Sequence, residues 1–245
     1  FALTVCGAHM NIPVAHIQGG EVSGTIDESL RHGMSKFSNF HFTATQETKN
    51  RLIKMGERSQ NIFVVGCPSI DALKQEKDVT RDVIIKKFKI DISKSYILVI
   101  QHPVTSELDK INSQFIETIE ALKNIHMQKL FVFPNNDAGS RKIIRLIKKY
   151  KFTYCKTLTL KGYKTLLKNS RALVGNSSSG IHEAATYKIP VVNIGTRQEG
   201  RTRSINVLNA KYDRKDILKS IKKALSENFN KKIKNLKNPY GNGNS

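Results

Sequence analysis

The sequence predicts an α/β fold built on parallel sheets, and three observations support this. Short apolar runs alternate strictly with amphipathic stretches, which is typical of strands joined by crossover helices. The apolar runs end at Gly, Pro, Asn or Asp, as buried strands often do. The stretches between them have helical periodicity: Phe115, Ile119, Leu122 and Ile125 share one helix face. A parallel sheet covered on both faces accounts for all three.

The order of predicted elements indicates two domains. Strands are predicted at 13–17, 40–44, 62–65, 96–100, 130–133, 152–155, 172–174 and 191–194. Helices are predicted at 27–37, 47–55, 81–88, 107–124, 140–150, 163–169, 180–187 and 214–225. There are too many predicted strands and helices for one small sheet. The polar segment 69–80 resembles a hinge helix and linker. We therefore predict two Rossmann-like domains, at 1–75 and 76–245.

The first predicted domain has only three strands, which is few for a Rossmann-like unit. Residues 1–10 resemble the tail of a helix, so we expect further sequence before them. We interpret 1–75 as the C-terminal part of an N-terminal domain. The turn-rich segment 238–245 is expected to end the compact part of the chain.

The composition favours a water-soluble protein with an anionic ligand. No apolar run approaches the roughly 20 residues of a membrane span, so we expect a cytoplasmic protein without a membrane partner. Residues 1–80 hold eight basic and eight acidic side chains, so the net charge of +21 belongs to residues 81–245. Lysines spread along predicted helices account for most of this charge, and no basic patch is interleaved with aromatic residues. Nucleic acid is therefore not an expected partner, whereas an anionic small molecule is favoured.

The three cysteines do not form a recognisable site. Cys6, Cys67 and Cys155 lie far apart, without a zinc-binding spacing and without the even number of a disulfide framework. We expect free thiols in a reducing compartment, and we expect no metal site.

The segment V-G-N-S-S-S-G-I-H-E, residues 174–183, predicts a turn from a strand into a helix that holds phosphate. A helix N-terminus offers unpaired N–H groups and partial positive charge to an anion. Ser177, Ser178 and Ser179 add hydroxyl donors, and Gly180 removes a side chain where a ligand would approach. Glu183, one turn later, is placed to accept hydrogen bonds from a ribose diol. A simple helix cap is the alternative interpretation.

Arginines after the next strand favour the phosphate interpretation. Arg197 and Arg201 follow the predicted strand 191–194, at its C-terminal end. Ligands of open α/β sheets bind at those ends, where arginine can contact phosphate bidentately.

Six motifs in order along the chain carry a resemblance to a known family. They are H-I-Q-G-G-E-V-S-G-T-I-D-E-S-L-R-H (16–32), V-G-C-P-S-I-D-A-L (65–73), Q-H-P-V-T (101–105), F-P-N-N-D-A-G-S (133–140), V-G-N-S-S-S-G-I-H-E-A (174–184) and N-I-G-T-R-Q-E-G-R (193–201). Together they resemble the hydrolysing UDP-N-acetylglucosamine 2-epimerases, which feed sialic-acid and legionaminic-acid pathways.

The resemblance implies a glycosyltransferase-B-type fold with the substrate between the domains. Residues 76–245 would then form the UDP-binding domain. Family members carry a further N-terminal stretch, with a catalytic Asp, and a final helix, and both are expected to be missing here. The resemblance also implies a homo-oligomer, either a dimer or a tetramer, and a reaction that uses no cofactor.

In the reaction implied by the resemblance, loss of the C2 proton and of UDP gives 2-acetamidoglucal. Water then adds at C1, and reprotonation at C2 gives N-acetylmannosamine. Glu21 and Asp27 would be the acid and base, with the alternatives that they are solvated loop carboxylates or that Asp27 caps a helix. Gln18 stands where some members have Glu, and an amide cannot act as the acid or base. Either Glu21 takes that role, or Gln18 only binds the substrate by a hydrogen bond, as in other members that lack Glu there.

Other residues match substrate-contacting positions of the family. His102 would be a third catalytic residue, which hydrogen-bonds the leaving diphosphate or the sugar, and Asn135 would contact the uridine or ribose. Arg31 and His32 would face the cleft, although His32 fits packing equally well. Within this resemblance, Ser177, Ser178, Ser179, Gly180, Glu183 and Arg197 become the UDP-binding residues.

Alternative functions remain open at the level of sequence. A non-hydrolysing 2-epimerase would return UDP-N-acetylmannosamine, and a diacetamido-trideoxy UDP-sugar is an alternative substrate. A retaining glycosyltransferase would use the same fold without a base over C2. A non-catalytic UDP-sugar-binding fragment belongs to a different functional class.

Overall fold

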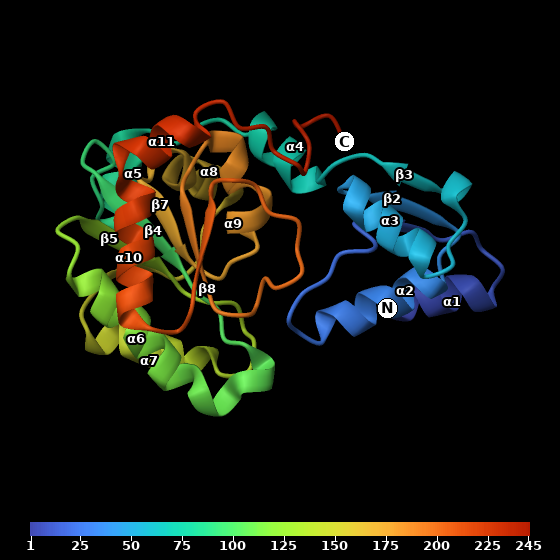
Figure 1. The fold of residues 1–245 in the computed structure, drawn as a ribbon, viewed down its shortest axis with the longest axis horizontal. Helices are drawn as coiled ribbons and strands as arrows, with labels where there is room; N and C mark the ends of the chain where they lie inside the picture. Colours follow the sequence, from blue (N-terminus) through green and yellow to red (C-terminus); the bar gives the residue numbers. More distant parts are fainter.

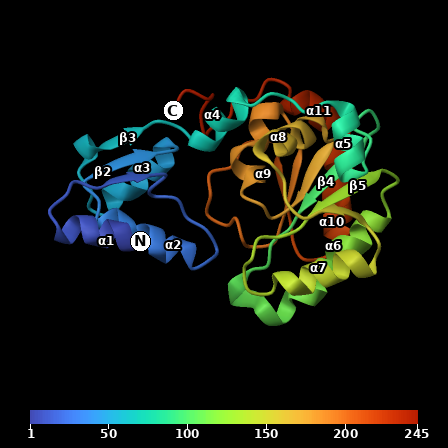
Figure 2. The ribbon, with the colours of Figure 1, turned by 180° about the vertical axis from the view of Figure 1, so that it is seen from behind.

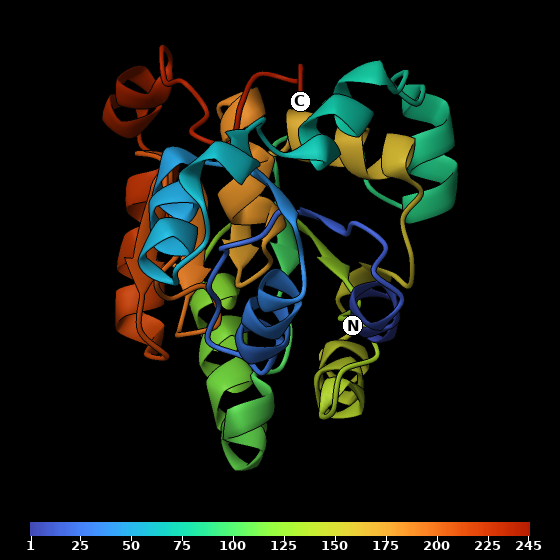
Figure 3. The same ribbon diagram turned by 90° about the vertical axis from the view of Figure 1, so that its right-hand side faces the viewer.

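The computed structural model describes residues 1–245 and divides them into two lobes of unequal size (Figure 1). The small lobe contains residues 1–64, and the large lobe contains most of the rest. In Figure 3 the small lobe stands in front of the large one, whose helices appear on either side of it. Both lobes are built on parallel sheets, as the sequence predicts.

The small lobe is a three-stranded parallel sheet with strand order β1-β2-β3. A capping box starts one of its helices, because Thr45 and Thr48 exchange side-chain-to-backbone hydrogen bonds. Its elements are α1 (Ala2–His9), β1 (Ala15–Ile17), α2 (Asp27–Lys36), β2 (Phe40–Thr43), α3 (Gln46–Lys54), η1 (Ser59–Asn61) and β3 (Ile62–Val64).

The large lobe is a six-stranded parallel sheet with strand order β6-β5-β4-β7-β8-β9. Its strands are β4 (Tyr96–Ile100), β5 (Gln128–Val132), β6 (Thr153–Cys155), β7 (Ala172–Gly175), β8 (Val191–Ile194) and β9 (Val207–Ala210). Its helices are α4 (Pro68–Gln75), α5 (Arg81–Phe88), η2 (Thr105–Lys110), α6 (Ile111–Lys123), α7 (Ser140–Lys149), α8 (Leu160–Asn169), α9 (Ser179–His182), η3 (Ala184–Tyr187), α10 (Arg214–Leu225) and α11 (Glu227–Ile233).

Alternating side chains of β4 build a core on each face of the large sheet. Ile97 and Val99 belong to the core that α6, α7 and α10 cover. Tyr96, Leu98 and Ile100 belong to the opposite core, under α5 and α8. Both faces are apolar because crossover helices cover both, which explains the fully buried run Tyr96–Ile100.

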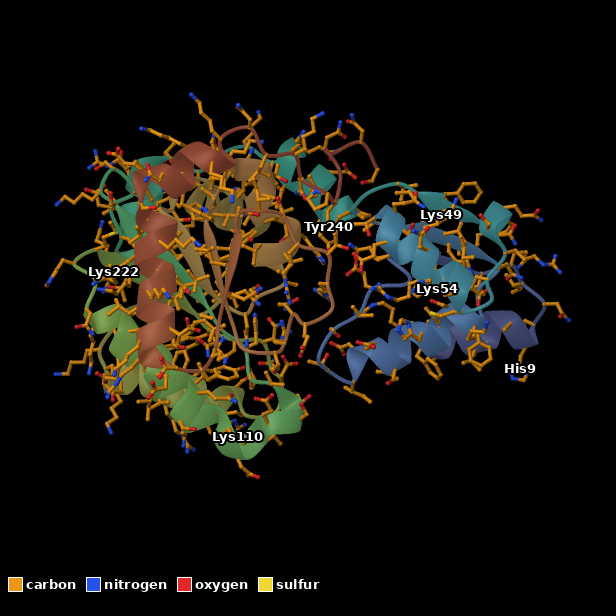
Figure 4. The ribbon with its side chains drawn as sticks, in the orientation of Figure 1. His9, Lys49, Lys54, Lys110, Lys222 and Tyr240 are labelled. Atoms are coloured by element: carbon orange, nitrogen blue, oxygen red, sulfur yellow. The ribbon has the colours of Figure 1, made fainter.

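Helix α4 and the C-terminal segment join the two lobes. Pro68 occupies the first turn of α4, where a missing N–H costs nothing. Tyr240 is fully buried with Ala44 of the small lobe and Ile181 of the large one, and it lies at the junction in Figure 4. The Cys67 N–H donates to the Tyr240 carbonyl at 2.8 Å. The turn-rich segment 238–245, predicted to end the compact part of the chain, packs into the junction at Tyr240.

Some predicted elements differ from those observed. The helix predicted at 107–124 begins as the 3-10 segment η2, which is kinked by the non-helical angles of Glu107, and the α-helix α6 starts only at Ile111. The helix predicted at 180–187 is a four-residue α9 followed by the 3-10 turn η3. Strand β9 and helix α11 were not predicted, since β9 is a short edge strand and α11 has only seven residues. Helix α4 packs on α8 of the large lobe, and the domain division at residue 75 stays a prediction.

The ends of β4 and β7 approach so closely that only glycine fits at residue 175. Gly175 has φ +135°, and a Cβ there would lie 2.0 Å from the Ile100 carbonyl oxygen. Gly56 also has a positive φ of +91°, but a Cβ there would meet only the end of Lys36, at 3.9 Å. A side chain at residue 56 would therefore cause backbone strain alone, whereas one at residue 175 would cause both strain and steric overlap.

We expect Gly175→Ala to lower the free energy of unfolding by about 3 kcal/mol or more, because strain and overlap combine. Gly56→Ala, the control, should cost only about 1–2 kcal/mol, from strain alone. Urea denaturation of both variants measures the difference. Equal losses would show that β4 and β7 can move apart without cost.

Candidate active site between the two lobes

A polar cavity of about 350 Å³ lies where the two lobes meet. Every residue that lines it is polar or charged. From the small lobe and α4 they are Gln18, Ser23, Thr25, Asp27, Arg31 and Ser69; from the large lobe, Ser178, His182, Glu183, Arg197, Gln198 and Arg201. In Figure 2 the segments that follow β7 and β8 face the small lobe.

A second cavity, of about 470 Å³, lies within the large lobe and has a mixed lining. Its apolar wall includes Phe133 and Leu158, and its polar wall includes His102 and Asn135. Ser178 and Arg197 line both cavities. A ligand with a planar base, an anionic linker and a polar sugar matches this sequence of environments.

The segment after β7 is fixed to the segment after β4 by one side chain. Asn176 Oδ1 accepts from the His102 N–H at 2.7 Å, and Asn176 Nδ2 donates to the His102 carbonyl at 2.9 Å. The Asn176 carbonyl in turn accepts from Arg197 Nη1 at 3.2 Å and from Gln198 Nε2 at 2.8 Å. The predicted residues His102 and Arg197 are thus brought together by Asn176, which sequence reasoning did not single out.

His102 is buried and electrically neutral. Burial, assisted by the positive charge of Arg197, lowers the pKa of His102 to about 4. Its Nδ1 accepts a hydrogen bond from the Asn135 N–H at 3.3 Å, so the ring carries its proton on Nε2. His102 therefore offers the mixed cavity an Nε2–H donor. The protonation of this ring does not change near neutral pH, because its pKa is about 4.

The serines after Asn176 form a compact turn. Ser177 Oγ accepts from the N–H of Ser179 at 3.3 Å and from its hydroxyl at 2.8 Å. A Cβ on Gly180 would lie 2.8 Å from the Val191 side chain, so this glycine permits packing on β8. The ligand-approach role predicted for Gly180 is not needed to explain it. Because α9 is only four residues long, its dipole is a minor contribution, and Arg197 is the main local cation.

Glu21 and Asp27 occupy different environments. Asp27 is exposed and lines the polar cavity, with Oδ2 3.3 Å from the Thr25 hydroxyl. It lies at the start of α2 but is not its cap, since Ile26 holds that position. Glu21 is only 3% exposed and does not line the cavity. The structure therefore separates the two predicted catalytic carboxylates.

Glu21 connects the small lobe to Arg201 of the large lobe. Its Oε2 lies 3.7 Å from Arg201 Nε and 4.0 Å from His182 Nε2, and Arg201 Nε also donates to the Val22 carbonyl at 2.8 Å. Burial raises the pKa of Glu21, against the lowering effect of Arg201. Burial also lowers the pKa of His182 to about 3, so this cavity-lining ring is neutral.

Of three further predicted residues in the small lobe, two line the polar cavity and one does not. Gln18 lines the polar cavity with φ +60°, a left-handed conformation that is uncommon for a residue with a side chain. Arg31 also lines it, and its Nη1 donates to the Glu21 carbonyl at 3.1 Å. His32 does not line the cavity and lies 3.9 Å from Glu28 on its own helix.

Glu183 is bound to the first turn of α4, the helix that joins the two lobes. Its Oε1 accepts from the Ser69 hydroxyl at 2.8 Å, and its Oε2 is shut off from solvent without a partner. Burial raises the pKa of Glu183, and the Ser69 hydrogen bond opposes that shift. Ser69 was missed because nothing in V-G-C-P-S-I-D-A-L marks it as a cavity residue.

The two parallel α/β lobes share their fold with solved structures of UDP-GlcNAc 2-epimerases. One is the UDP-GlcNAc 2-epimerase of Neisseria meningitidis bound to UDP-GlcNAc, with TM-score 0.83 and 21% identity. The match covers 99% of this chain and 70% of that one. The Methanocaldococcus jannaschii UDP-GlcNAc 2-epimerase in complex with UDP-GlcNAc and UDP matches with TM-score 0.78 and 19% identity, over 98% and 68% of the chains.

The chain belongs to the UDP-N-acetylglucosamine 2-epimerase family, whose sequence profile matches residues 1–245. The UDP-N,N'-diacetylbacillosamine 2-epimerase (hydrolyzing) of Legionella pneumophila is 42% identical over 99% of this chain. The polysialic acid biosynthesis protein P7 of Escherichia coli is 33% identical over 98% of it. The chain spans 64% and 63% of the lengths of these two relatives.

Two wider features of the structure concern membrane-spanning helices and metal ligands. None of its helices combines the length and apolar character that crossing a membrane requires. No group of three or more His, Cys, Asp or Glu side chains is arranged to hold a metal ion.

The neutral state of His102 predicts an acid-dependent loss of stability. The unfolded ring takes up its proton near pH 6.5, whereas the folded ring does so only near pH 4. Between these values the unfolded chain binds more protons, so stability falls as the pH falls. From pH 7.5 to 4.5, His102→Gln should lose about 2 kcal/mol less than wild type.

Urea denaturation at the two pH values measures this difference. His126→Gln, at an exposed position, is the matched control and should keep the wild-type pH dependence. Identical pH dependence in wild type and His102→Gln would show that His102 is not held neutral by the fold.

Proposed function

We propose that the protein is a hydrolysing UDP-sugar 2-epimerase that acts on UDP-N-acetylglucosamine or a related diacetamido UDP-sugar. One observation carries this proposal: a mixed cavity and a fully polar cavity meet at Ser178 and Arg197. The relatives support it, since that of Legionella pneumophila is described as a hydrolyzing UDP-N,N'-diacetylbacillosamine 2-epimerase. A relative from Campylobacter jejuni, 31% identical over 90% of this chain, is a hydrolyzing GDP/UDP-N,N'-diacetylbacillosamine 2-epimerase.

In this proposal each cavity receives one part of the substrate. The uracil ring enters the mixed cavity, against Phe133 and beside Asn135. The diphosphate lies where the cavities meet, between Ser178 and Arg197. The hexose occupies the polar cavity, where Asp27 of the small lobe faces it.

The position of each residue relative to the cavities suggests its role in the proposed reaction. A carboxylate beside C2 takes or returns the C2 proton. Of the two carboxylates predicted for this role, Glu21 and Asp27, only Asp27 lines the cavity. Arg197 and the Nε2–H of His102 stabilise the negative charge that UDP acquires as the C1–O bond breaks. Glu21, behind Arg201 and His182, holds these groups in place rather than touching the sugar.

Incubation of the protein with UDP-N-acetylglucosamine in deuterated water tests the reaction class. We expect free UDP together with an N-acetylmannosamine that carries deuterium at C2. Asp27→Asn should lower this turnover about 100-fold or more, within the range attributed to acid–base groups, while UDP affinity changes little. Epimerised sugar nucleotide without UDP release would instead identify the non-hydrolysing reaction. Binding of UDP without turnover would identify a binding protein.

Arg197→Ala tests the position of the diphosphate. Loss of a charge-assisted contact of about 1.5–3 kcal/mol should weaken UDP binding roughly 10- to 100-fold. Uridine, which lacks the phosphates, should bind both proteins equally. Arg171→Ala removes the same charge from an exposed site in the same lobe and serves as the control. Calorimetry measures all three proteins, and equal loss of uridine and UDP binding would contradict the assignment.

A further inference from the structure

A row of side-chain hydrogen bonds runs along the polar cavity from the small lobe to the large one. Gln18 Nε2 lies 2.8 Å from Cys67 Sγ, and Cys67 Sγ lies 3.0 Å from Ser69 Oγ. Ser69 Oγ lies 2.8 Å from Glu183 Oε1. Gln18, Ser69 and Glu183 all line the cavity. The row therefore connects a small-lobe loop to the end of α9 through the start of α4.

The available protons give this row a single direction. The Gln18 amide nitrogen can only donate, and the Ser69 hydroxyl donates to Glu183 Oε1. The Ser69 hydroxyl has one proton, which goes to Glu183, so its oxygen must accept the thiol proton of Cys67. Burial raises the pKa of Cys67, which keeps that proton on sulfur. All three bonds thus point toward the carboxylate of Glu183.

One oxygen of Glu183 remains without a donor. Oε2 is shut off from solvent and has no partner, a state that costs about 1–3 kcal/mol until a donor arrives. Glu183 lines the polar cavity, and Ser177, Ser178 and Ser179, which precede it along the chain, line the mixed cavity. The part of a UDP-sugar between the base and the diphosphate is the ribose, and its hydroxyls are donors.

We propose that Ser69 is a positioning residue that holds Glu183 so that Oε2 accepts a hydrogen bond from a ribose hydroxyl. This inference rests on the UDP-sugar site proposed above. Ser69 suits the role because Pro68 and the buried Ile70 flank it at the start of α4. Without its hydroxyl, Oε1 loses the donor that opposes protonation of Glu183, and the carboxylate is free to rotate.

Calorimetry with UDP and with 2′,3′-dideoxy-UDP, which lacks both ribose hydroxyls, tests the inference. Ser69→Ala should weaken UDP about tenfold, which corresponds to one hydrogen bond to a charged group. Ser69→Thr keeps a hydroxyl and should bind UDP within about twofold of wild type. The dideoxy ligand should bind wild type and both variants equally. A purely structural role for Ser69 would not produce this dependence on the ribose.

Each other outcome has a definite meaning. If Ser69→Ala weakens both ligands equally, or weakens neither, Ser69 does not act through a ribose contact of Glu183. If Ser69→Thr fails to restore UDP affinity, the hydroxyl is not the active feature. If wild type binds no UDP, both this inference and the proposed function are wrong. Binding by wild type with unchanged affinity in Ser69→Ala overturns the inference alone.

Discussion

The paired hydrogen bonds between the Asn176 side chain and the His102 backbone are the contact on which the site depends. They hold together the segments that follow β4 and β7, at the point where Gly175 brings the two strands closest. The Asn176 carbonyl then anchors Arg197 from a third segment. The neutral donor His102 and the cation Arg197 are therefore held side by side at the edge of one sheet. Because both are fixed before a ligand arrives, binding does not have to order a long loop.

The two lobes have different parts in the proposed chemistry. The large lobe supplies the cation, the buried imidazole and the apolar wall, all fixed by a sheet with a core on each face. The small lobe supplies Asp27 and Gln18 from the segment between β1 and the first turn of α2. Glu21 and Arg201 link the lobes through a buried ion pair, whose loss would leave an unpaired charge inside the junction.

Much of the fold was predictable because the buried strands are short apolar runs that can be recognised from their own residues. The buried runs Tyr96–Ile100 and Val191–Ile194 were predicted to the residue, since both faces of these strands are apolar. The burial of Tyr240 was not predictable, because its partners lie far away in sequence and its neighbours are turn-forming residues. Local patterns report on local structure, and the junction between the lobes is built from distant segments.

The candidate site shows the same division. His102 and Arg197 were singled out because each follows a strand at the end where ligands bind. Asn176 and Ser69 were missed because their importance lies in what they hold, which is a backbone segment in one case and a carboxylate in the other. The burial of Glu21 was likewise invisible, since it depends on Arg201, which is 180 residues further along.

The attachment of Tyr240 beside Cys67 affects how the lobes can move. The chain passes between the lobes at Val65–Cys67, and the C-terminal segment lies against the same place through the Cys67–Tyr240 hydrogen bond. A single flexible connection would allow the small lobe to swivel in any direction. Two neighbouring attachments oppose twisting, and bending about the line that joins them must first break the contacts of Arg201 with Val22 and Glu21. Such bending would change the width of the polar cavity and leave the mixed cavity, which lies wholly in the large lobe, unchanged.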